Sequence, residues 1–152
     1  MASENILQVI DLCKSFHKLE VLKNISVSFN KNEVVSIIGP SGGGKSTFLR
    51  CLNLLEKPTS GQILIDGVDI CAKGQSKHID QHRQKMGMVF QQFNLFNNMN
   101  VMKNLTAGPV RIKGMDRAEA EAKALELLGR VGLADRADAY PSQLSGGQKQ
   151  RI

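Results

Sequence analysis

Apolar and polar residues alternate over the first part of the chain in a way that predicts strands. The stretches ILQVIDL and VLKNISVSF, which begin at Ile6 and Val21, carry apolar side chains at mostly alternate positions. Alternation of this kind is typical of a strand with one buried face. The run from Val34 to Ile38 is apolar except for Ser36, which predicts a strand buried on both faces, as in a parallel sheet.

A helix is predicted directly after a glycine-rich segment at residues 39–44. The apolar residues that follow fall on one helical face: Phe48, Leu49, Leu52 and Leu55. Pro58 closes the pattern because proline does not continue a helix. The chain therefore runs from strand to glycine-rich loop to helix.

A tight hairpin is predicted around Asp66-Gly67, which separates two short runs rich in β-branched residues in GQILIDGVDI. A polar stretch at residues 72–85 then leads to a short predicted strand from Gly87 to Phe90. The first half of the chain is therefore predicted to be rich in β-structure.

The second half has helical periodicity. Asp116 and Glu119 have the spacing of a capping box, and Asn100 is a competent N-cap for an earlier helix. One predicted helical face, reaching about Gly129, consists of Ala118, Ala122, Leu125 and Leu128. We expect a helical subdomain after the β-rich half.

The composition narrows the class of protein. The 152 residues are 41% apolar and 22% charged, which is ordinary for one soluble domain or part of one. The net charge of +6 suits an anionic partner, but the basic residues are scattered, so nucleic acid is disfavoured. Three cysteines without CxxC spacing favour a reducing cytosol. No apolar run has the length of a membrane span, so membrane association is expected only through a partner.

The glycine-rich segment carries candidate chemistry. It fits the phosphate-loop pattern G-x-x-x-x-G-K-[ST] with Gly39, Pro40, Ser41, Gly42, Gly43, Gly44, Lys45 and Ser46. Glycines let backbone N–H groups turn toward phosphates, and the helix N-terminus adds unpaired donors. Lys45 would neutralise the β- and γ-phosphates, Ser46 would offer its hydroxyl to Mg²⁺, and Thr47 would reach the α-phosphate. The alternative is a glycine-rich turn that only caps a helix.

With this loop placed, the chain resembles the ATP-binding subunits of ABC transporters, most closely those of bacterial polar amino-acid importers. The resemblance rests on three motifs in family order: GPSGGGKST, then MVFQQFNLF at residues 88–96, similar to the family's Q-loop, and LSGGQ at residues 144–148, similar to its signature. It implies an α/β P-loop NTPase of the ABC type. Residues 1–96 would form an antiparallel β subdomain and a RecA-like core, and residues 97–152 a helical subdomain with the signature.

The resemblance also implies roles for residues outside the phosphate loop. Phe16 would stack on adenine, although a single Phe at a strand end is more often a core residue. Gln91 would coordinate Mg²⁺ or the attacking water and sense a transmembrane partner, and its alternative role is a cap. The signature would contact the γ-phosphate held by the opposite subunit of a head-to-tail dimer, through Ser145, Gly146, Gly147 and Gln148.

Some family elements are missing from the 152 residues, so the RecA-like core is expected to be incomplete. These are the Walker B strand ending in Asp-Glu, the D-loop, and the H-loop with its histidine. The segment ILID, which ends at Asp66, cannot replace the Walker B strand because it precedes the Q-loop. We therefore expect this chain alone not to hydrolyse ATP. Without its sheet neighbours, the Val34–Ile38 run is expected to have unpaired edges and an exposed apolar face.

The leading hypothesis is an ATP-binding subunit at the cytoplasmic face of the cell membrane. It would use ATP and Mg²⁺, pair with a second copy, and bind a membrane permease that works with a separate substrate-binding protein. One alternative is a nucleotide-binding fragment without turnover. Another is a non-transport ABC ATPase acting on DNA, which is disfavoured because no coiled-coil insertion or basic stripe is present.

Overall fold

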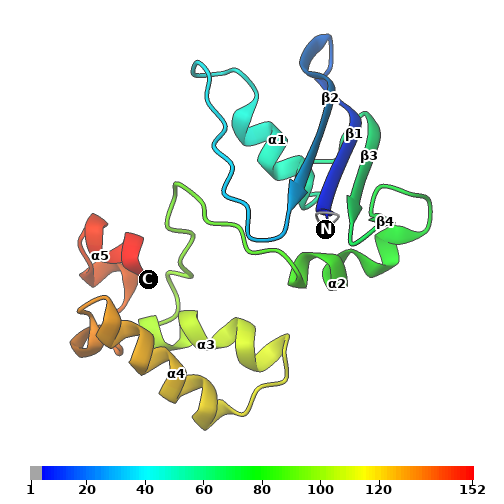
Figure 1. Cartoon of the computed structure of the whole chain (residues 1–152). Helices are drawn as coiled ribbons and strands as arrows, with labels where there is room; N and C mark the ends of the chain where they lie inside the picture. The colour runs from blue at the N-terminus through cyan, green and yellow to red at the C-terminus, as the bar shows by residue number, and fades with distance from the viewer. Residues whose placement is uncertain (1–4) are drawn as a thin grey trace. The chain divides into compact units, whose positions relative to one another are not determined.

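The computed structural model describes residues 5–152, and the chain divides into two compact units after Met88. The first unit is built on one antiparallel sheet with the strand order β2-β1-β3-β4. Figure 1 shows the two long strands side by side, joined by a short turn. The elements of the first unit are β1 (Asn5–Phe16), β2 (Leu19–Asn30), α1 (Lys45–Leu52), β3 (Ser60–Ile65), β4 (Val68–Asp69), η1 (Gln75–His78) and α2 (Ile79–Gln84). The predicted antiparallel β subdomain is confirmed.

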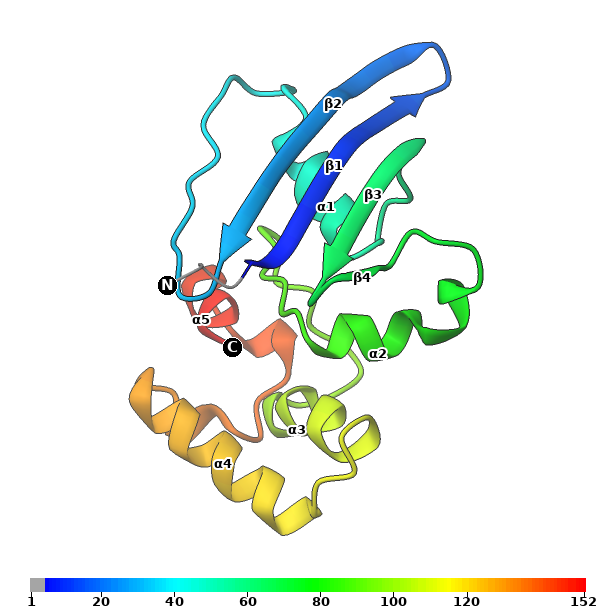
Figure 2. The same cartoon turned by 45° about the vertical axis from the view of Figure 1, so that its right-hand side comes forward.

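Helix α1 covers one face of this sheet, as Figure 2 shows. The core between them contains Phe48 and Cys51 from the helix, packed with the sheet residues Val9, Leu12, Leu22, Ile63 and Ile65. The predicted helical face was partly wrong, because Leu49 and Leu55 are 45% and 47% exposed. The helix ends at Leu52, so Leu55 lies beyond it and the buried stripe is the i, i+3 pair Phe48 and Cys51.

The predicted Asp66-Gly67 hairpin is confirmed, since Ile65 pairs with Val68 across that turn. A less obvious glycine lies at the start of β3. A Cβ atom on Gly61 would come within 2.5 Å of the Asp11 carbonyl oxygen, and its φ is +96°. Only glycine allows β1 and β3 to approach so closely at this point.

Two predicted strands, the parallel strand Val34–Ile38 and the short strand Gly87–Phe90, are wrong for this structure. Residues 33–40 and 86–90 have no regular structure, and Val34, Ile38 and Val89 are 94%, 92% and 98% exposed. A parallel strand exists only by pairing with a neighbour, and within residues 5–152 the sheet contains no such neighbour. The exposed apolar face expected for Val34–Ile38 is therefore present.

The second unit is helical. Its elements are α3 (Val101–Arg111), α4 (Arg117–Arg130), η2 (Ala134–Arg136), η3 (Pro141–Gln143) and α5 (Gly146–Arg151). Both predicted N-caps are confirmed, although Asp116 caps its helix without the reciprocal Glu119 bond of the predicted capping box. The Asn100 side chain accepts a hydrogen bond from Lys103 N at 2.9 Å, and Asp116 Oδ1 accepts one from Ala118 N at 2.8 Å.

The buried face of α4 differs from the prediction. Ala120, Ala124 and Leu128 are buried, whereas Ala118, Ala122 and Leu125 are exposed. Rows of alanine at i, i+4 occur on both faces, and packing against the neighbouring helix decides which one is buried. Leu128 joins Val101, Leu133 and Leu144 in the small core of this unit. None of the helices in residues 5–152 is long and apolar enough to cross a membrane.

Candidate functional site

The glycine-rich loop lies between the end of β2 and α1, and its last residue is fixed by contact with β2. Gly44 is the N-cap of α1 and has φ +83°, in the left-handed region. A Cβ atom there would lie 3.0 Å from Leu22 Cδ2 and 3.1 Å from the Val21 carbonyl oxygen. Glycine is therefore required both by backbone conformation and by space. It lets the start of α1 pack directly against the sheet.

The amino end of α1 is suited to an anion. In the described part of the chain, no side chain caps this helix, so its first N–H groups are available as donors. Lys45 bends back over the loop, and its Nζ donates hydrogen bonds to the carbonyl oxygens of Gly39 at 2.8 Å and Pro40 at 2.7 Å. Ser46, in the first turn, is exposed. The loop thus gathers a cation, a hydroxyl and free amides in one place.

The other end of α1 is anchored in the core. Cys51 is fully buried, and this burial raises the pKa of its thiol to about 11. Desolvation disfavours the thiolate, so Cys51 remains protonated at neutral pH and serves as an apolar packing residue. The helix that carries the phosphate loop is thereby held rigidly on the sheet.

Phe16 belongs to the same unit as the phosphate loop. The residue is 40% exposed at the end of β1, so it is not a core residue. Phe16 pairs with Leu19, and Lys14 pairs with Leu22, the residue that Gly44 contacts. Three residues of a strand span about 10 Å. Strand β2 therefore connects Phe16 to Gly44, the last residue of the phosphate loop, over a short distance.

Lys14 was not singled out from the sequence. Its Nζ lies 4.6 Å from the centroid of the Phe16 ring and 2.6 Å from Glu56 Oε1. The only sequence signal for this contact is that Lys14 lies two residues before Phe16, on the same face of the strand. Its other partner, Glu56, is distant in the sequence.

The predicted site residues outside the phosphate loop, its first helical turn and Phe16 lie in the second unit. Gln91 is exposed in the irregular segment that precedes α3. Ser145 is the N-cap of α5, where its Oγ accepts a hydrogen bond from Gln148 N at 3.3 Å and Gln148 Oε1 accepts one from Ser145 N at 2.9 Å. Cβ atoms on Gly146 or Gly147 would meet nothing within 4 Å. The signature is thus a capped helix start with an open glycine surface.

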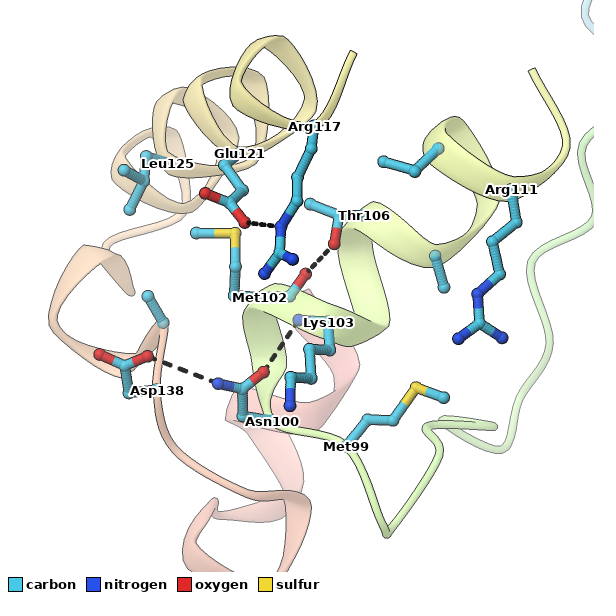
Figure 3. A pocket seen from close by; sticks show the side chains of 13 residues that line it. Met99, Asn100, Met102, Lys103, Thr106, Arg111, Arg117, Glu121, Leu125 and Asp138 are labelled. Carbon is cyan, nitrogen blue, oxygen red and sulfur yellow. Dashed lines mark hydrogen bonds and ion pairs between the residues drawn. The ribbon is translucent and has the colours of Figure 1, made fainter. Parts of the chain in front are cut away.

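A groove between α3 and α4 was also missed, because three separate segments form it. Its volume is about 520 Å³, and Figure 3 shows its charged side chains. Arg117 Nε donates to Glu121 Oε1 at 2.8 Å across one side, and Asn100 Nδ2 donates to Asp138 Oδ1 at 3.4 Å on the other. Lys103 and Arg111 add two more cations to the lining.

Comparison with known protein families agrees with this geometry. A family model described as ABC transporter matches residues 22–152. The chain belongs to the ABC transporter family. The resemblance recognised from the three motifs is confirmed, and so is the ABC ATPase type of fold.

Individual relatives are ATP-binding proteins of amino-acid transport. The chain is 47% identical over 149 residues to the glutamine transport ATP-binding protein GlnQ of Escherichia coli, covering 97% of this chain and 60% of that protein. It is 50% identical over 147 residues to the arginine transport ATP-binding protein ArtM of Bacillus subtilis, covering 97% and 60% respectively. The chain thus spans about three fifths of the length of these relatives.

Solved structures show the same fold. The dimeric bacterial ABC transporter cassette MJ0796 matches with a TM-score of 0.86 and 35% identity, over 95% of this chain and 66% of that one. The same cassette in a post-hydrolysis state, bound to ADP and phosphate, matches with a TM-score of 0.84 and 34% identity, with the same coverage.

Proposed function

We propose that this protein is the ATP-binding subunit of an ABC importer and couples ATP binding and hydrolysis to uptake of a polar amino acid. The observation that carries the proposal is the phosphate loop, where Lys45 and the uncapped amino end of α1 meet. The substrate class is supported by the glutamine and arginine transport proteins that the chain resembles.

In this proposal, residues 39–47 bind the triphosphate. Backbone N–H groups of the loop, at Gly39, Ser41, Gly42, Gly43 and Gly44, and of the first turn of α1 donate to phosphate oxygens, and Thr47 reaches the α-phosphate. Lys45 exchanges its two carbonyl contacts, at Gly39 and Pro40, for the β- and γ-phosphates. Because charge-assisted hydrogen bonds are stronger than those to neutral carbonyls, this exchange favours binding.

Mg²⁺ fits this site because it is usually held by one or two protein groups and the nucleotide phosphates. The exposed hydroxyl of Ser46 and the amide of Gln91 are the groups that we assign to it. When bound, the ion neutralises charge on the β- and γ-phosphates. Phe16 stacks on adenine through the exposed part of its ring.

Hydrolysis would take place between two copies of the protein. The signature residues Ser145, Gly146, Gly147 and Gln148 would contact the γ-phosphate held by the partner's phosphate loop. The open surface over the two glycines supports this role, and the dimeric MJ0796 cassette is a structural precedent. Turnover is proposed for the complete dimer.

A permease subunit would hold the protein at the cytoplasmic face of the membrane, and a substrate-binding protein would deliver the amino acid to it. We assign contact with the permease to Gln91 and the helical unit. The groove between α3 and α4 supports this assignment because it offers a concave, charged surface.

A Lys45→Ala substitution tests the proposal. We expect MgATP binding to weaken by about a hundredfold or more, because the loss removes the cation that neutralises the phosphates. Lys31→Ala is the control, since it removes the same charge from an exposed position in the same unit. Binding is measured by calorimetry, and phosphate release is measured on the complete dimeric protein. Unchanged binding by Lys45→Ala would refute the proposal, whereas binding without phosphate release would favour a nucleotide-binding module without turnover.

A further inference from the structure

Lys14 is unusually constrained for a lysine on a strand. Its side chain is only 12% exposed, and its Nζ lies 2.6 Å from Glu56 Oε1. The same ammonium donates a hydrogen bond to the Lys57 carbonyl oxygen at 2.7 Å and lies 4.6 Å from the centroid of the Phe16 ring. Burying a charge is costly unless it is paired, so these contacts together hold the ammonium in one position.

We propose that Lys14 is a positioning residue for the nucleotide base, because its anchored ammonium holds one face of the Phe16 ring and leaves the other face to stack on adenine. This inference rests on the adenine-stacking role of Phe16 in the proposed function. It adds a residue that acts on the base through Phe16 without contacting the nucleotide.

The electrostatics of the pair favour this role. An aromatic ring carries negative charge on its faces, and a cation within about 6 Å of the centroid is attracted to it. The ammonium therefore draws electron density toward the side of the ring where it lies. The opposite face becomes less negative, which reduces its repulsion from the π-face of a stacked purine.

The anchors of Lys14 also connect Phe16 to the helix of the phosphate loop. Glu56 and Lys57 belong to the segment that follows α1. This segment is attached to β1 on both sides of Lys14, because Thr59 N donates to the Cys13 carbonyl oxygen at 2.8 Å and Ser15 N donates to Thr59 Oγ1 at 3.0 Å. Lys14 thus holds the Phe16 ring in a fixed position relative to the segment at the carboxyl end of α1.

The loss of Lys14 would have different effects on ligand binding if its role were purely structural than if it positions Phe16. If Lys14 only fastened the segment after α1 to the sheet, its loss would disturb the phosphate loop and weaken every phosphate ligand equally. If it acts through Phe16, its loss affects only ligands that carry a base. ATP and inorganic triphosphate therefore distinguish the two roles.

The test compares the dissociation constants of MgATP and of magnesium triphosphate for Lys14→Met, which keeps an apolar stem but removes the cation. We expect ATP binding to weaken roughly three- to tenfold and triphosphate binding to change less than about twofold. Lys14→Arg keeps a cation for the ring and should restore ATP binding. Lys23→Met is the matched control, because the Lys23 side chain is 70% exposed.

One further variant tests the inference if Lys14→Met folds poorly, and a double variant tests whether the effect of Lys14 depends on Phe16. Glu56→Gln removes the anionic anchor but retains the lysine, and should also weaken ATP more than triphosphate. In a Phe16→Leu background, Lys14→Met should have no additional effect on ATP binding.

Several outcomes would overturn the inference: equal losses for ATP and triphosphate, an undiminished effect without Phe16, or unchanged ATP binding by Lys14→Met and Glu56→Gln. Failure of the unmodified chain to bind either ligand would instead overturn the proposed function, and the inference with it.

Discussion

The phosphate loop before α1 and the Ser-Gly-Gly segment before α5 are both glycine-rich helix starts, yet glycine has a different purpose in each. At α1, Gly44 has a left-handed φ and lies against β2. At α5, Gly146 and Gly147 lie within the helix and face open space. Gly44 is therefore required by the fold, whereas Gly146 and Gly147 leave the surface at the start of α5 free of side chains.

The two helix starts also differ in how their amides are satisfied. Within residues 5–152, α1 has no side-chain cap and Lys45 lies over its loop. Helix α5 has a complete capping box formed by Ser145 and Gln148. Helix α1 also buries Phe48 and Cys51. In the proposed function, the first start is therefore a phosphate-binding site with its own cation, and the second contacts a phosphate that a partner subunit supplies.

The largest effect is expected from replacing glycine by alanine at the two starts. Gly44→Ala should lower the free energy of unfolding by about 2–4 kcal/mol, because it combines a strained left-handed residue with contacts of 3.0–3.1 Å to β2. Gly147→Ala should change it by less than about 0.5 kcal/mol, since alanine favours the helix and meets no atom. Urea denaturation followed by circular dichroism measures both. Equal effects of the two variants would contradict the comparison.

A smaller effect is expected from removing the serine at each start. Ser145→Ala should destabilise α5 by about 1 kcal/mol, because it removes the N-cap that accepts from Gln148 N. Ser41→Ala should leave α1 unchanged, since Ser41 is exposed and does not cap the helix. Amide hydrogen exchange reports the local stability of each helix. If these substitutions made amide exchange faster in α1 than in α5, the assignment of Ser145, and not Ser41, as a helix cap would be wrong.

Features determined by neighbouring residues were predicted well from the sequence. The Asp66-Gly67 turn and the caps at Asn100 and Asp116 depend only on a few adjacent backbone groups. The phosphate loop was recognised for the same reason, because its pattern and its function are local.

Features that depend on distant partners were not predicted. The Val34–Ile38 run has the composition of a buried parallel strand, but strand formation depends on neighbours that the sequence pattern alone does not provide. The buried face of α4 depends on its packing against α3. Lys14 was missed because its ion pair with Glu56 forms only in the folded chain.

We propose that the start of α1 binds phosphate by itself and that the start of α5 does not. It is tested most directly by titrating the isotopically labelled chain with magnesium triphosphate and following its amide signals by NMR. At concentrations where the chain is monomeric, we expect saturable shifts for residues 41–47 and none for residues 145–148. Shifts confined to residues 145–148, or no saturable shift at residues 41–47, would contradict it.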